Sequence, residues 1–106
     1  MEDPRPERAV PRELVDELAR ARRIVARSDL SPRWVEGAVV LAQAWADAEA
    51  TEHGWPAAPV AVPTTAALPD VLEAVARARL ATARDADEAG PRMGTDLAAL
   101  RRRHGG

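Results

Sequence analysis

The sequence predicts an all-α fold, in which three main helices and a short C-terminal helix form a small helical bundle. Apolar residues recur at intervals of three and four positions over long stretches, which is the spacing of one face of an α-helix. Residues that favour helix starts and helix stops bound these stretches, and prolines crowd the segment between the second and the third. We expect helices at about 11–27, 31–53, 66–89 and 95–104, with a proline-rich crossover at 54–69.

The first predicted helix, at about 11–27, begins at Pro11, because proline suits the first turn, where an N–H has no helical partner. Its apolar stripe consists of Leu14, Leu18, Ala21 and Val25. Residues 1–10 contain prolines among charged residues and are predicted to form a mobile tail. A short turn at 28–30 leads into the next helix, which predicts an antiparallel helical hairpin.

The second predicted helix, at about 31–53, has the clearest ends in the chain. Ser31 can accept a hydrogen bond from the first free N–H groups, and Pro32 fits the first helical position. Gly54 suits the left-handed residue that ends a helix, and Pro56 prevents the helix from continuing. Apolar residues occupy more than half of its circumference, so we expect a central helix with neighbours on at least two sides.

All aromatic residues of the chain are tryptophans, and they lie within or just beyond this second helix. Trp34 and Trp45 share one stripe, so we expect both in the core. Their bulk matters because 24 of the 106 residues are Ala, which buries far less apolar surface than Leu. Trp55 follows the helix stop, and we expect it at an edge, where it holds the crossover against the hairpin and is available to a partner.

The third predicted helix, at about 66–89, ends where Gly90 and Pro91 interrupt the pattern. Its last turns contain no large apolar residue and are expected to be exposed or frayed. Thr95 then caps a short amphipathic helix at about 95–104. A helix of this length is unstable alone, so it must dock on its own chain or on a partner.

These elements define a single domain over 11–104, with a glycine tail at 105–106. The predicted core residues are Trp34, Leu41, Trp45, Leu14, Leu18, Leu72 and Val75. The predicted partner contacts are Trp55, Leu97, Leu100, Arg101 and Arg102. The last four of these lie on the short C-terminal helix.

Charge and composition exclude several classes of protein. The net charge is −2, and an acidic second helix lies between two arginine-bearing segments, which is not the profile of a general nucleic-acid binder. No apolar run approaches the length of a membrane span and the charged, proline-broken N-terminus is no signal peptide, so we expect a cytoplasmic protein without membrane contact. The abundance of Ala, Arg, Gly and Pro, with no Lys, is typical of a high-GC bacterial genome.

No residue pattern predicts catalysis or a bound cofactor. The absence of Cys excludes disulfides and thiolate metal sites, and the Glu49–His53 pair would supply only two metal ligands. Glu36, within an apolar helix, is a candidate base, although a surface carboxylate or a partner for an arginine of the first helix is the simpler interpretation. We therefore expect no cofactor, no metal and no enzymatic activity.

The sequence favours a non-enzymatic protein-interaction module, an accessory subunit or a regulator whose partner is another protein or a second copy of the chain. The layout of residues 70–106, a helical body followed by a linker and a short amphipathic helix, resembles that of bacterial antitoxins and implies a regulator that wraps its partner. Two alternatives remain open, a nucleic-acid-binding helical regulator that uses arginine-rich faces and a small all-α enzyme. The arginines of the first alternative are Arg20, Arg22, Arg23, Arg27 and Arg101 to Arg103.

Overall fold

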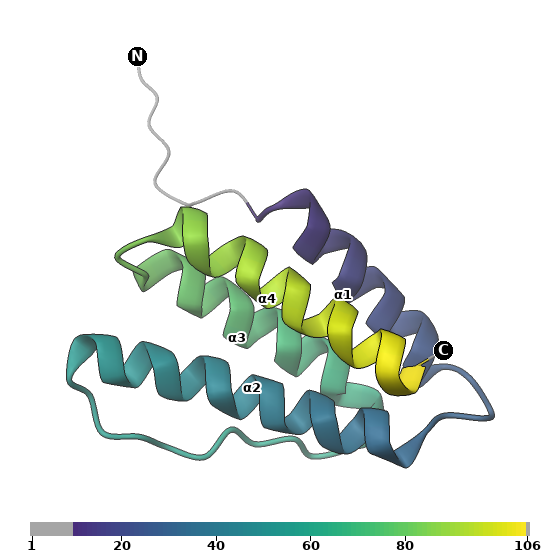
Figure 1. Cartoon of the computed structure of the whole chain (residues 1–106). Helices are drawn as coiled ribbons and strands as arrows, with labels where there is room; N and C mark the ends of the chain where they lie inside the picture. Colours follow the sequence, from purple (N-terminus) through teal and green to yellow (C-terminus); the bar gives the residue numbers. More distant parts are fainter. Residues whose placement is uncertain (1–9, 106) are drawn as a thin grey trace.

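The computed structural model describes residues 10–105, and over these residues the chain folds into four α-helices (Figure 1). They are α1 (Arg12–Val25), α2 (Pro32–His53), α3 (Leu68–Thr82) and α4 (Ala86–Leu100), with a 3-10 turn η1 (Thr65–Ala67) before α3 and a π-helical turn η2 (Arg101–Gly105) after α4. The predicted all-α bundle is confirmed. Apart from Val10, the predicted N-terminal tail lies outside the described residues.

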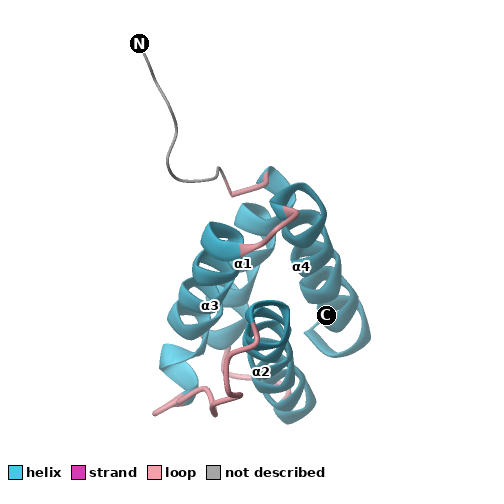
Figure 2. Cartoon of the chain, turned by 90° about the vertical axis from the view of Figure 1, so that its left-hand side faces the viewer, coloured by secondary structure: helices cyan, strands magenta, loops and turns pink. Residues whose placement is uncertain are grey.

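The antiparallel helices α3 and α4 form the middle of the bundle, with α1 on one side of them and α2 on the other (Figure 2). Each outer helix packs on both α3 and α4, whereas α1 and α2 make almost no contact with each other. The predicted hairpin of the first two helices is therefore wrong, and so is the central position expected for α2. The expected neighbours on at least two sides of α2 are present, because α3, α4 and the segment that follows α2 pack on it, whereas Val39 and Val40 remain exposed.

One apolar core runs through the bundle, and its largest fully buried side chains are Trp34, Leu14, Leu68, Leu72 and Met93. Trp45 is also buried, and its Nε1 donates to Asp96 Oδ2 on α4 at 3.1 Å. Among the other predicted core residues, Leu18 is buried, and Leu41 and Val75 are half-buried at the edge of the core. Small alanines fill the spaces between these bulky residues, as the composition requires.

The boundary between the third and fourth helices differs from the prediction. Helix α3 ends at Thr82, and α4 begins at Ala86, where the Asp85 carboxylate accepts the N–H of Glu88 at 3.1 Å. Gly90 lies inside α4, where its lack of a side chain leaves room for Pro11. A Cβ at this position would approach Pro11 Cγ to 2.5 Å. Pro91 also lies inside α4, on its exposed side.

Helix α4 is consequently a long, packed element and not a short, detachable one. Leu97 and Leu100 are each 2% exposed and belong to the core, so they do not form a free partner surface. Thr95 lies within the helix and does not cap it. The layout that resembled bacterial antitoxins, a body followed by a linker and a separate helix, is absent from residues 70–105.

Residues 54–64 return along α2 in an extended conformation before η1 begins (Figure 1). Gln43 of α2 holds this segment, since its Nε2 donates to the Ala58 carbonyl at 3.0 Å and its Oε1 accepts the Val60 N–H at 2.8 Å. Trp55 does not hold it as predicted. Its side chain stacks on His53 with ring centroids 4.6 Å apart, and the residue remains 53% exposed.

Within the described part of the chain, none of the helices combines the length and the apolar character needed to cross a membrane.

Candidate functional site

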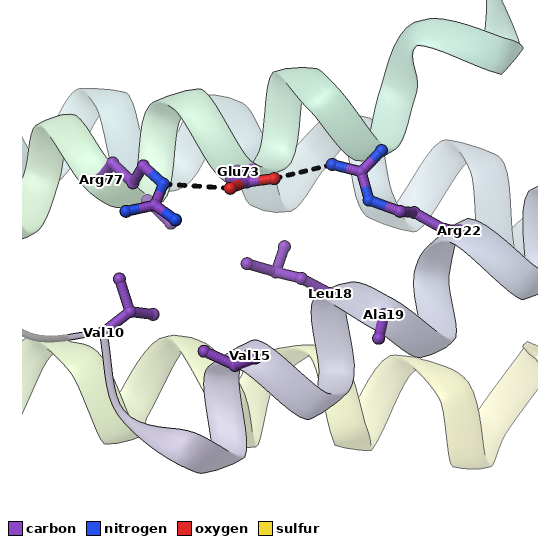
Figure 3. Close-up of a pocket in the computed structure, with 8 residues that line it drawn as sticks. Val10, Val15, Leu18, Ala19, Arg22, Glu73 and Arg77 are labelled. Carbon is purple, nitrogen blue, oxygen red and sulfur yellow. Dashed lines mark hydrogen bonds and ion pairs between the residues drawn. The ribbon is translucent and has the colours of Figure 1, made fainter.

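A hollow of about 210 Å³ lies on the surface between α1 and α3 (Figure 3). Its lining is mainly apolar and consists of Val10, Val15, Leu18, Ala19 and Ala76, with Arg22, Glu73 and Arg77 along one side. We call it the α1/α3 groove. It combines an exposed valine with space that no side chain of the described chain fills.

The groove exists because the residues between α1 and α3 are too small to fill the space between the two helices. Leu18 and Ala76 are buried and form its floor, and Ala19 is too short to cover the gap between the helices. Val15 lies one helical turn from Ala19 on the rim and is 44% exposed, because the core stripe of α1 is already complete without it.

Arg22, Glu73 and Arg77 line the groove, and Arg22 also pairs with Asp70, which is not part of the lining; we call these four side chains the ionic row. Arg22 donates from Nη1 to Asp70 Oδ1 and from Nη2 to Glu73 Oε1, both at 2.7 Å. Arg77 Nε donates to Glu73 Oε2 at 3.0 Å, and Figure 3 shows Arg77, Glu73 and Arg22 side by side. The row alternates in sign and its formal charges cancel.

The hydrogen bonds of the row stabilise its charged forms. Hydrogen bonds from Arg77 and Arg22 lower the pKa of the Glu73 carboxyl below its ordinary value. Hydrogen bonds to Asp70 and Glu73 raise the pKa of the Arg22 guanidinium. Glu73 and Arg22 therefore stay ionised at neutral pH. The lining of the groove offers apolar surface and ion-paired charges and contains no Ser, His or Cys, so it is suited to holding apolar groups.

A second cluster, between α1 and α4, accounts for two of the predicted partner residues. Arg101 donates from Nε and Nη2 to the two carboxylate oxygens of Glu17, each at 3.0 Å, and Arg20 Nη1 donates to Glu17 Oε2 at 2.8 Å. Glu17 is buried, so Arg101 is committed to its own chain. Burial raises the pKa of Glu17, but the hydrogen bonds and charges of Arg101 and Arg20 together outweigh burial and lower it. Arg102 is exposed beside this cluster.

Glu49 and His53, the candidate metal pair at the end of α2, form polar contacts with Thr82 of α3. His53 Nε2 lies 2.9 Å from the Thr82 carbonyl oxygen, and Thr82 Oγ1 donates to Glu49 Oε2 at 2.5 Å. Among residues 10–105, no group of three or more His, Asp or Glu side chains is arranged to hold a metal ion. Glu36, the candidate base, is exposed on α2.

The structure thus distributes the predicted partner residues instead of gathering them. Trp55 is exposed at one end of α2, Leu97 and Leu100 are in the core, and Arg101 is paired with Glu17. The groove was missed, although the sequence held one signal for it. Val15 is a large apolar residue that flanks the α1 stripe without being needed to complete it.

Comparisons of this chain with models of known protein families, with curated proteins and with solved structures find no match.

Proposed function

We propose that this chain is a non-enzymatic protein-interaction module that holds apolar side chains of another protein chain in the α1/α3 groove. The observation that carries the proposal is Val15, which is 44% exposed beside an apolar hollow of about 210 Å³. A partner chain that covers Val15 and fills the hollow removes apolar surface from water, which stabilises a complex by about 25 cal/mol for each Å² buried.

The marginal character of the core supports the same function. Alanine supplies many of the buried positions, so the bundle gains less from burial than a leucine-rich core of equal length. A partner that binds only the folded chain adds stability in proportion to its concentration and affinity. Association is therefore a direct way for this chain to become more stable.

Three of the arginines on which the nucleic-acid alternative depends are already paired within the chain. Arg20 and Arg101 both donate to Glu17, and Arg22 donates to Asp70 and Glu73, so these guanidinium groups have carboxylate partners on their own chain. A phosphate backbone would have to compete with those carboxylates.

Site-specific photo-crosslinking in the native host tests the proposal. A photoreactive amino acid replaces Ala19 on the groove, and the matched control replaces Ala44, which is exposed on α2. We expect a discrete covalent protein adduct from position 19 and not from position 44, and we expect Val15→Asp to abolish it. No adduct at position 19, or equal adducts at both positions, would show that the groove does not hold a protein chain.

A further inference from the structure

We infer, on the basis of the proposed function, that the partner segment in the α1/α3 groove carries an aspartate or glutamate beside its apolar side chain, and that this carboxylate binds Arg77. An apolar lining alone accepts any aliphatic or aromatic side chain, whereas a charge beside it selects among partners. Two features of the groove point to an acidic partner, namely the open hydrogen-bond donors of Arg77 and the net charge of the lining.

Arg77 has donors that no carboxylate of the described chain occupies. An arginine donates from Nε and from both terminal nitrogens, and Arg77 uses its Nε toward Glu73 Oε2 at 3.0 Å. Its Nη1 and Nη2 have no hydrogen-bond partner among residues 10–105. Arg22, the other cation of the lining, uses both of its terminal nitrogens on Asp70 and Glu73. Arg77 can therefore hold a further carboxylate, whose two oxygens match its two terminal nitrogens.

The free end of Arg77 lies at the groove. Arg77 lines the hollow together with Val10 and with Ala76, its buried neighbour in sequence. Figure 3 shows the terminal nitrogens of Arg77 on the side of Val10 and away from Glu73. The Arg77 side chain is 59% exposed, so a carboxylate can reach it without displacing a side chain of the bundle. An acidic residue can therefore bind Arg77 while a neighbouring apolar side chain of the same segment enters the hollow.

The charges that line the groove favour an anion. Arg22 and Arg77 carry two positive charges against the one negative charge of Glu73, which gives the lining a formal charge of +1, because Asp70 lies outside it. Both oxygens of Glu73 are already neutralised, since Oε1 accepts from Arg22 at 2.7 Å and Oε2 accepts from Arg77 at 3.0 Å. An acidic partner is therefore complementary to the groove, whereas a basic partner would place like charges beside Arg77.

The hollow limits the size of the apolar group that accompanies the carboxylate. A cavity of roughly 150 Å³ accommodates benzene, and the hollow measures about 210 Å³. A single leucine or phenylalanine side chain fits this volume. We therefore expect a short motif in the partner, in which one such residue has an aspartate or glutamate next to it or one helical turn away.

Two matched small molecules test the preference for a carboxylate. Isocaproate joins the branched end of a leucine side chain to a carboxylate, and isocaproamide is its neutral counterpart of the same shape. Each is titrated into the isotope-labelled chain at neutral pH and followed by NMR. We expect isocaproate to bind about threefold or more tightly than the amide, and to shift the methyl signals of Val15 and the side-chain N–H signals of Arg77. Equal affinity for the two probes would overturn the inferred carboxylate.

Arg77→Gln tests whether Arg77 is the source of the preference. It removes the charge and the paired terminal nitrogens, so both probes should bind this variant alike. The matched control is Arg92→Gln on α4, because Arg92 is 71% exposed and pairs with Glu88 one helical turn earlier, as Arg77 pairs with Glu73. The control should keep the wild-type preference, and circular dichroism checks that both variants keep the wild-type helix content. A preference that persists in Arg77→Gln would overturn the assignment to Arg77.

The photoreactive residue at position 19 extends the test to the protein partner in the native host. Arg77→Gln should lower the yield of its adduct about threefold or more, and Arg92→Gln should leave the yield unchanged. An adduct that Arg77→Gln does not weaken overturns the acidic partner and leaves the groove as an interaction site. A preference for isocaproate without any adduct from position 19 overturns the protein partner, and with it the proposed function, while the binding of a carboxylate to Arg77 stands.

Discussion

The tryptophans differ sharply in burial, and this difference determines what each contributes to stability. Trp34 is 1% exposed, whereas Trp55 is 53% exposed and rests on His53. We expect Trp34→Ala to lower the free energy of unfolding by about 3–5 kcal/mol, because alanine-rich surroundings cannot close the cavity. Trp55→Ala should lower it by less than about 1 kcal/mol. Urea unfolding followed by circular dichroism measures both, and similar losses for the two variants would contradict the assignment of Trp34 to the core.

Gly37 on α2 is required by Leu100 at the end of α4. A Cβ built at Gly37 would overlap Leu100 Cδ1, and Leu100 is buried, so its side chain has little room to move away. We expect Gly37→Ala to destabilise the protein, although Ala favours an α-helix over Gly by about 1 kcal/mol. Leu100→Ala should cost about 2–5 kcal/mol on its own.

The double variant provides the control for this contact. With Leu100 shortened, the new methyl group at position 37 fills part of the cavity, so the combined loss should be smaller than the sum of the separate losses by about 1 kcal/mol or more. Additive losses in urea unfolding would mean that the two residues do not limit each other.

At the scale of elements, one side chain connects the extended crossover to α2. Gln43 donates to the Ala58 carbonyl and accepts the Val60 N–H, as a neighbouring strand would. Gln43→Ala should release residues 54–64 and speed hydrogen exchange at Val60, at a cost of about 1–2 kcal/mol. Gln43→Glu keeps the acceptor for Val60 but places a carboxylate oxygen against the Ala58 carbonyl and Asp47, so it should not rescue the loss at neutral pH. Unchanged exchange at Val60 in Gln43→Ala would show that apolar packing alone holds the crossover.

Local signals in the sequence predicted the ends of α2 correctly and misplaced the start of α4, and the reason is physical. The cap at Ser31 and the left-handed Gly54 depend on neighbours in sequence, and both are found. Gly90 and Pro91 carry an equally clear local stop signal, but tertiary contacts override it, because Gly90 accommodates Pro11 and the neighbouring Ala89 is buried. The true start also had a signal, Asp85 followed three residues later by Glu88.

The sequence offered Val15 as a signal, but its patterns could not place the groove between α1 and α3, for a related reason. Its volume depends on Ala19 of α1 and Ala76 of α3, which line it from helices that are far apart in the chain. Helical periodicity identifies the buried face of each helix, and it correctly selected Leu14, Leu18 and Leu72. It does not determine which helices become neighbours, so the predicted hairpin of the first two helices concealed the α1/α3 contact.

On the scale of the whole molecule, charged pairs connect helices that are distant in sequence. Glu17 connects α1 to Arg101 after α4, Glu73 connects α3 to Arg22 of α1, and Glu52 at the end of α2 accepts Arg79 Nη1 at 2.6 Å. Hydrogen bonds from Arg79 and the Arg84 backbone lower the pKa of Glu52 as well. The bundle therefore depends on three carboxylates whose charged form is favoured in the folded state.

These three lowered pKa values predict how stability varies with pH. A carboxyl whose pKa is lower in the folded than in the unfolded chain binds fewer protons when folded, so acid favours unfolding. Its contribution is complete above the ordinary pKa of 4.5 and is lost as the pH falls from there through the lowered folded value. The three carboxylates should therefore leave the melting temperature nearly constant between about pH 6 and 8. The melting temperature should decrease as the pH is lowered beyond about 5.

Glu17→Gln isolates the buried member of this set. At pH 7 it should lower the free energy of unfolding by about 1–3 kcal/mol, since Arg101 keeps a neutral acceptor but loses its charged partner, and Arg101 is partly exposed to solvent. At about pH 3 the carboxyl of the unfolded wild-type chain is protonated, which weakens the contribution of its charge to folding, so the two unfolding free energies should approach each other. Glu36→Gln is the control, because Glu36 is exposed on α2 and its replacement should leave the pH dependence as it is. A gap between wild type and Glu17→Gln that is equally wide at pH 7 and pH 3 would show that Glu17 acts through its shape and not through its charge.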